Sequence, residues 1–67
     1  MKQYRVTFQR WNERKPHNQL SFNEGTFAMH IFNEMCKIAP SAVENIRHVT
    51  LESVENGEAT LIKKVSF

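Results

Sequence analysis

The side chains that could act as nucleophiles or bases are few, and their spacing does not suit catalysis. The chain has a single cysteine, Cys36, and the nearest histidine along the chain is His30. On a helix these two positions lie about 120° apart around the axis, so the imidazole does not face the thiol. Nucleophilic catalysis needs a base beside the nucleophile and a group that orients the base. We therefore interpret Cys36 as a small apolar packing residue.

The carboxylates and histidines are no better arranged for acid–base or metal chemistry. Glu52, Glu55 and Glu58 fall around a predicted hairpin tip, whereas glycosidase-type chemistry needs carboxylates that converge in a cleft. His30 and Glu34 have the i, i+4 spacing of two metal ligands on a helix, but no second pair with ligand spacing accompanies them. We interpret them as an exposed, hydrogen-bonded pair on the helix surface.

Glycine is too sparse for a phosphate-binding loop, because Gly25 and Gly57 are isolated from each other. We explain these two glycines by a helix start and a turn. The sequence therefore predicts no catalytic, metal or cofactor site, and it favours a non-catalytic protein over an enzyme.

The length of 67 residues allows one hydrophobic core, so we expect a single domain that spans residues 1–67. Cys36 has no partner for an intrachain disulfide, and no apolar segment follows the charges at the N-terminus, which together predict a cytoplasmic protein. No apolar run approaches the roughly 20 residues that cross a bilayer, so we expect no membrane partner. A core of this size gives only marginal stability, and small domains often gain further stability by associating with a second subunit.

Charge is unevenly distributed along the chain, although the net charge is only +2. Residues 1–17 contain five basic residues against one glutamate, residues 18–62 contain six glutamates against two basic residues, and Lys63 and Lys64 follow. The first segment is therefore basic enough to be a candidate for contact with anions.

Alternating side chains predict a half-buried strand over residues 2–11. Residues 12–18 are polar and contain Pro16, which indicates a loop, and residues 19–22 form a candidate short second strand. The two faces of the first strand are Tyr4, Val6 and Phe8 on one side and Arg5, Thr7, Gln9 and Trp11 on the other.

Residues 24–39 predict an amphipathic helix, because their apolar residues recur with a period of about 100° per residue. Asn23 or Ser21 can cap the start of the helix, and Ser21 with Glu24 has the spacing of a capping box. Pro40 ends the helix. A repeat of the capping pattern at residues 41–44 predicts one further helical turn. The apolar side comprises Phe27, Ala28, Ile31, Phe32, Met35, Ile38 and Ala39, and the arc formed with Met29, Phe32 and Cys36 extends past what one sheet face needs.

The last third predicts a β-hairpin around Asn56 and Gly57, with strands over residues 47–55 and 58–67. A two-residue turn would place two glutamates opposite each other and would mix polar and apolar residues on both faces. A three-residue loop, with a bulge at the glycine, pairs two leucines and gathers the apolar residues on one face. We therefore expect the bulged register, with Leu51 opposite Leu61.

These elements predict an α+β fold of β(β)αββ order, in which one main helix packs on one face of a three- to four-stranded antiparallel sheet. The first strand can lie beside either arm of the hairpin, so the strand order stays open. The expected core residues are Tyr4, Val6, Phe8, Phe22, Phe27, Ile31, Met35, Ile38, Ile46, Val49, Leu51, Leu61, Val65 and Phe67.

One helix covers only one face of a sheet, so the opposite face is expected to stay open to a partner. Tryptophan and arginine are enriched where interfaces concentrate their binding energy, and uncovered apolar surface on a marginal core favours contact with another protein or a second copy. A competing interpretation folds the ring of Trp11 over the edge of the chain's own core. The predicted partner-binding residues are Arg5, Thr7, Gln9, Trp11, Thr50, Val54 and Ile62.

Nucleic-acid binding is the alternative function, because basic residues interleaved with aromatic ones suit phosphate contact and base stacking. The acidic middle of the chain and the modest net charge weigh against it. By analogy with other small domains that hold no cofactor, we expect an adaptor or inhibitor of another protein, with a homodimer as a further partner. The alternative nucleic-acid-binding residues are Arg5, Arg10, Trp11, Arg14 and Lys15.

Overall fold

The computed structural model describes residues 2–12, 14, 18–41 and 45–67. Strands and helix follow one another in the order ββαββ, which confirms the predicted α+β fold and the short second strand. The elements are β1 (Lys2–Arg10), β2 (Asn18–Phe22), α1 (Gly25–Ile38), β3 (Ile46–Glu55) and β4 (Glu58–Ser66).

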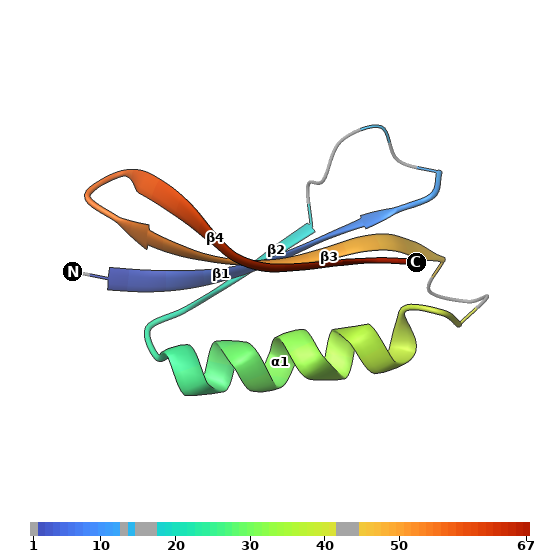
Figure 1. The fold of residues 1–67 in the computed structure, drawn as a ribbon, viewed down its shortest axis with the longest axis horizontal. Coiled ribbons are helices and arrows are strands. Elements are labelled where there is room, and N and C mark those ends of the chain that lie inside the picture. Colours follow the sequence, from blue (N-terminus) through green and yellow to red (C-terminus); the bar gives the residue numbers. More distant parts are fainter. Residues whose placement is uncertain (1, 13, 15–17, 42–44) are drawn as a thin grey trace.

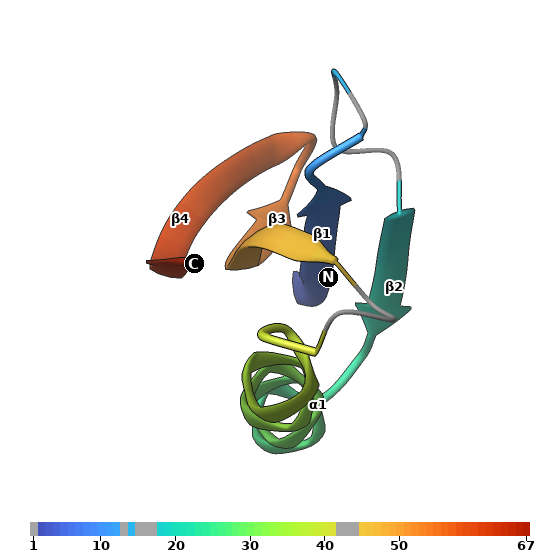
Figure 2. The same cartoon turned by 90° about the vertical axis from the view of Figure 1, so that its right-hand side faces the viewer.

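The four strands form one antiparallel sheet in the order β2-β1-β3-β4. The first strand therefore lies beside the first arm of the hairpin, which settles the order that the sequence left open. Figures 1 and 2 show α1 on one side of this sheet only, where it packs against β1, β3 and β2. Among the described residues, no helix combines the length and the hydropathy that crossing a bilayer requires.

The core lies between α1 and the covered face of the sheet, and it is small. A ring of partly buried side chains packs around it, including the predicted core residues Tyr4, Phe8 and Phe22. Phe67, which was also expected in the core, is 38% exposed. The buried apolar residues are Val6, Ala28, Phe32, Ala39, Ile46, Val49 and Leu51.

The helix is rotated relative to the predicted orientation. Phe27 and Ile38, which were expected in the core, are 52% and 43% exposed, whereas Phe32, expected at the margin, is 1% exposed. Helical periodicity identifies an apolar arc but not its centre, which depends on where the helix lies across the sheet. Because α1 lies against β1 and β3, the stripe through Ala28 and Phe32 meets the middle of the sheet.

The ends of the helix also differ in part from the prediction. The helix begins at Gly25, one residue later than the apolar pattern suggested, and no side-chain hydrogen bond caps it at Glu24. The predicted capping box with Ser21 is therefore wrong. The predicted helical turn at residues 41–44 lies mostly outside the described residues, because 42–44 are not among them.

The hairpin turn contradicts the predicted three-residue loop. Asn56 and Gly57 both have positive φ, 53° and 81°, which is what a two-residue turn of this hand requires. Glu55 and Glu58 are paired opposite each other. Both glutamates are exposed, so water and salt screen the repulsion that made this register look unfavourable.

The bulge occurs farther along the hairpin, in β4. Leu61 lies opposite Glu52 and Lys63 lies opposite Leu51, so Ile62 has no partner between them. The two-residue turn points Leu61 away from the core. The extra residue shifts the alternation of β4 by one position, so the residues that follow it alternate between the two faces as the sequence predicted. The predicted pair of Leu51 with Leu61 is wrong, and Leu61 is 57% exposed instead of buried.

Candidate functional site

The sheet face opposite α1, called the open face below, carries rows of side chains that run across the strands. Residues paired directly in a sheet point to the same side, so the observed register assigns every row. The predicted residues Arg5, Thr7, Gln9, Thr50 and Val54 do share this face. The rows are Gln3, Val54 and Ala59; Ser21, Arg5, Glu52 and Leu61; Gln19, Thr7, Thr50 and Lys64; and Gln9, His48 and Ser66.

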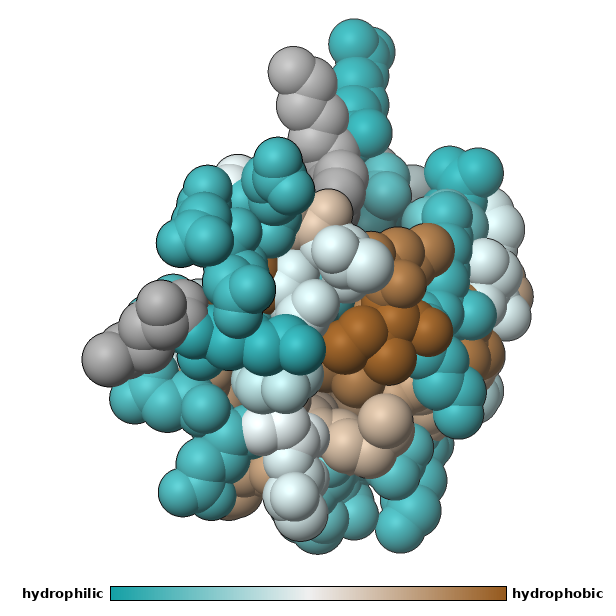
Figure 3. Space-filling model, turned by 60° about the vertical axis from the view of Figure 1, so that its left-hand side comes forward, coloured by the Kyte–Doolittle hydropathy of each residue, from teal (hydrophilic) through white to brown (hydrophobic). Residues whose placement is uncertain are grey.

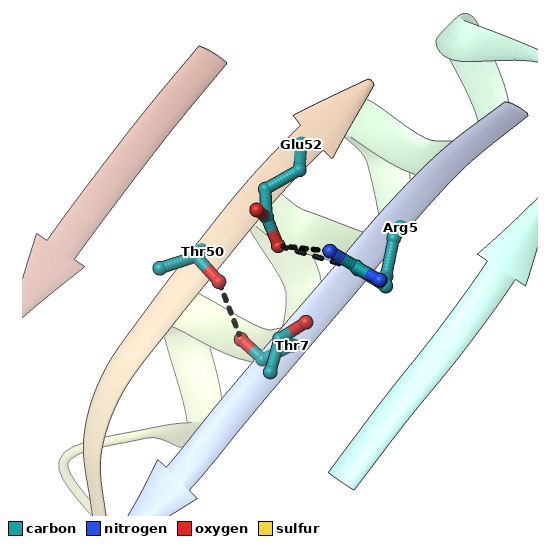
Figure 4. A network of polar contacts seen from close by, with 4 residues as sticks. All are labelled: Arg5, Thr7, Thr50 and Glu52. Atoms are coloured by element: carbon teal, nitrogen blue, oxygen red, sulfur yellow. Dashed lines mark hydrogen bonds and ion pairs between the residues drawn. The ribbon is translucent and has the colours of Figure 1, made fainter. Parts of the chain in front are cut away.

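The middle of the open face is polar and internally bonded, as Figure 4 shows with the helix behind the sheet. Arg5 donates from Nε and Nη2 to Oε1 of Glu52, at 3.3 and 3.2 Å. The hydroxyl of Thr50 donates to the backbone carbonyl of Thr7 at 3.4 Å. Thr7 is only 8% exposed although no helix covers it, because the neighbouring rows surround it. The guanidinium charge of Arg5 is therefore neutralised within the chain.

Next to this centre lies a pocket of about 80 Å³, lined by Thr7, Gln9, His48, Thr50 and Lys64. The imidazole of His48 also shares a 2.9 Å hydrogen bond, through Nδ1, with the hydroxyl oxygen of Ser66. Partial burial, and then the positive charges of Lys64 and Arg47, lower the pKa of His48 below its ordinary value. The lowered pKa favours the neutral imidazole, and Lys64 is the cation of the pocket.

The β4 side of the open face is apolar in the two rows nearest the hairpin tip. Val54 and Ala59 pair in one row, and Leu61 ends the next. Ile62, which was predicted on the open face, lies in the bulge without a paired partner and is 47% exposed, so the register does not assign it to that face. Figure 3 views the molecule from the side of the hairpin tip and shows an apolar patch on this flank of the molecule, bordered by hydrophilic side chains.

Trp11 lies apart from the rows, just beyond the end of β1. Its backbone N–H donates to the carbonyl of Asn45 at 2.9 Å, and the guanidinium carbon of Arg47 lies 5.0 Å from the centre of its ring. It lines a separate hollow near the end of α1 together with Pro40 and Phe67. The ring is 55% exposed, so it is not folded into the core, and it does not join the residues of the open face.

The structure separates two of the candidate nucleic-acid-binding residues, Arg5 and Arg10, onto opposite faces of the sheet. Arg5 is paired with Glu52 on the open face, while the guanidinium carbon of Arg10 lies 5.2 Å from the ring centre of Phe8, a residue of the covered face. Arg14 is exposed, and Lys15 lies outside the described residues.

The side chains considered for chemistry have structural surroundings in the described part of the chain. Burial raises the pKa of the Cys36 thiol, with a smaller opposing effect from Lys63, so the reactive thiolate is disfavoured. Glu34 forms its ion pair with Lys37, at 3.3 Å, rather than with His30. The described residues contain no group of three side chains that could hold a metal ion.

Sequence reasoning missed the pocket residues His48 and Lys64 and the exposed Leu61. It gave neither pocket residue a role. The exposure of Leu61 could have been predicted from Asn56 and Gly57. This pair prefers a two-residue turn, and that turn sets the register that points Leu61 to the open face.

Fold and site together define a small α+β domain with one open, partly polar sheet face. Comparison with protein-family models, with curated proteins and with solved structures gives no match to this chain.

Proposed function

We propose that this chain is a small, non-catalytic protein-binding module that acts through its open face, as an adaptor or inhibitor of another protein. The observation that supports the proposal is the composition of that face. An internally bonded polar centre lies beside the half-buried Val54 and the exposed Ala59 and Leu61, and no described helix or strand covers it. Protein interfaces combine an apolar core with satisfied polar groups in this way.

The distribution of charge favours a protein partner over a nucleic acid. Sequence-independent binding to nucleic acid needs several lysine or arginine side chains that can each neutralise a phosphate. On the described open face the cations are Arg5 and Lys64, and Arg5 is already paired with Glu52. Lys64 alone cannot neutralise several successive phosphates of a nucleic-acid backbone.

The test compares open-face variants with a matched control in capture from a lysate of the source organism. Val54→Arg and Leu61→Arg each place a charge on the apolar side of the open face, and Asn33→Arg places the same charge on an exposed position of α1. We expect both open-face variants to lose proteins that the wild-type chain and the control retain, while circular dichroism shows all of them folded. Equal capture by the folded variants contradicts the proposal.

The same samples distinguish a heterologous partner from a second copy. If the open face serves a different protein, gel filtration with light scattering at micromolar concentration gives the mass of a monomer. A dimer that Val54→Arg dissociates would assign the open face to self-association instead.

A further inference from the structure

The pocket on the open face has the size of a small functional group. Its volume of about 80 Å³ exceeds the about 10–15 Å³ that one water molecule requires. It is much smaller than the roughly 300–1,000 Å³ of sites for cofactors and drug-sized ligands. A group of three or four heavy atoms at the end of a side chain fits these dimensions.

The residues that line the pocket include groups that can bind an anion. They are Thr7, Gln9, His48, Thr50 and Lys64, and Lys64 is the one with a full positive charge. Among the described residues no carboxylate lies within ion-pair distance of Lys64. The carboxylate of Glu52, in the adjacent row, is held by two bonds from Arg5. The cation of the pocket therefore lacks a counter-charge from the chain that surrounds it.

We propose that this pocket receives the carboxylate of an aspartate or glutamate side chain of the partner protein. This inference rests on the proposed function, and it names the chemistry of the partner at that face. Lys64 supplies the charge, and the hydroxyl of Thr7 can supply a neutral hydrogen bond, whereas that of Thr50 already donates to the Thr7 carbonyl. Complementary charge at an interface fixes orientation and selects partners more than it adds raw affinity, so this contact specifies which protein docks on the apolar side of the face.

Lys63 provides a matched control, because it is adjacent to Lys64 and faces the other way. Lys63 is opposite Leu51 and Lys64 is opposite Thr50, which puts the two ammonium groups on opposite faces of the sheet. Nζ of Lys63 lies 5.7 Å from the ring centre of Phe32, on the covered side. Lys63→Gln and Lys64→Gln therefore make the same change in net charge, but only the second changes the pocket.

The experiment is an NMR titration of the ¹⁵N-labelled chain with hexaglutamate, with hexaglutamine as the neutral control. We expect hexaglutamate to shift the amide signals of Thr7, Thr50 and Lys64, and hexaglutamine to leave them unchanged. Lys64→Gln should weaken hexaglutamate binding about fivefold, the upper end for an exposed charge pair, and Lys63→Gln should leave it within twofold. Equal weakening by the two variants, or shifts that avoid the pocket, overturns the proposal.

Two further probes separate the sources of an anion. Inorganic phosphate and a ten-residue oligothymidylate are titrated under the same salt conditions. Weaker binding of both than of hexaglutamate supports a carboxylate site. Tighter binding of the oligonucleotide at the same amides overturns it in favour of a nucleic acid.

Failure of this inference is distinct from failure of the proposed function. If Val54→Arg abolishes capture from lysate while Lys64→Gln does not, the open face binds a protein but the acidic contact is wrong. If Val54→Arg leaves capture intact, the proposed function fails whatever hexaglutamate does.

Discussion

The orientation of α1 can be tested by making the same substitution at two phenylalanines of the helix. Phe32 is 1% exposed, and Phe27 is 52% exposed. Phe32→Ala should cost about 3–5 kcal/mol of unfolding free energy, because it removes a fully buried ring and leaves a cavity. Phe27 keeps an edge-on contact with Phe22, with ring centres 5.2 Å apart, and such a pair contributes about 0.5–1.5 kcal/mol. We therefore expect Phe27→Ala to cost about 1–2 kcal/mol, its half-buried area included.

The assay is urea unfolding followed by far-ultraviolet circular dichroism, with the slope and the midpoint fitted for each variant. A domain of this length has a total stability of roughly 3–10 kcal/mol, so Phe32→Ala can be unfolded even without denaturant. Phe32→Leu and Phe27→Leu therefore accompany the alanine pair, and the first should still lose about 1–2 kcal/mol while the second loses less. Equal losses at the two positions, or a larger loss at Phe27, would refute the orientation of the helix described above.

Three further predictions concern the hairpin and the open face. Gly57→Ala should cost about 1 kcal/mol, because φ is +81° and nothing lies within 4 Å of the added Cβ; an unchanged thermal midpoint contradicts the two-residue turn. A double-mutant cycle of Arg5→Gln and Glu52→Gln should give a coupling of about 0.5–1 kcal/mol in low salt, since the side chains are 31% and 23% exposed, and additive losses would show that the pair contributes nothing. In a proton NMR titration the pKa of His48 should lie below 6.5 and rise in Lys64→Gln. Because the unfolded chain then takes up the proton first, the stability that His48 contributes is present above pH 6.5 and is lost as the pH falls through the pKa in the folded protein; a pKa above 6.5 reverses this sign.

The fold class could be predicted because its signals are local. Alternation in β1, helical periodicity in α1 and the turn residues Asn56 and Gly57 each depend on a few neighbours in sequence. The strand order could not be predicted, because both arms of the hairpin carry similar patterns. The sequence also could not predict which side of the helix meets the sheet. Ala28 and Phe32 are buried because of where the helix lies across β1 and β3.

The errors in the site arise where the strands break their own alternation. Ile46 and Val49 are three residues apart, so a regular strand would point them to opposite faces, yet both are buried. The irregularity between Gln9 and Arg10 in the pairing of β1 with β3 makes this arrangement possible. β1 itself ends at Arg10, so alternation no longer places Trp11. The position of a bulge depends on packing between residues that are far apart in the sequence. A single sequence therefore does not show where a strand contains one.

The edges of the sheet explain why the open face, rather than an edge, is the surface that we assign to a partner. Unpaired backbone groups on an edge strand invite pairing with another chain, and natural sheets prevent it with short edge strands, lysines and bulges. The β2 edge has five residues. The longer β4 edge carries Lys63, Lys64 and the bulge at Ile62. Both edges thus carry features that oppose edge-to-edge pairing with a second copy, so we assign the partner to the side chains of the open face, where Val54, Ala59 and Leu61 lie next to one another.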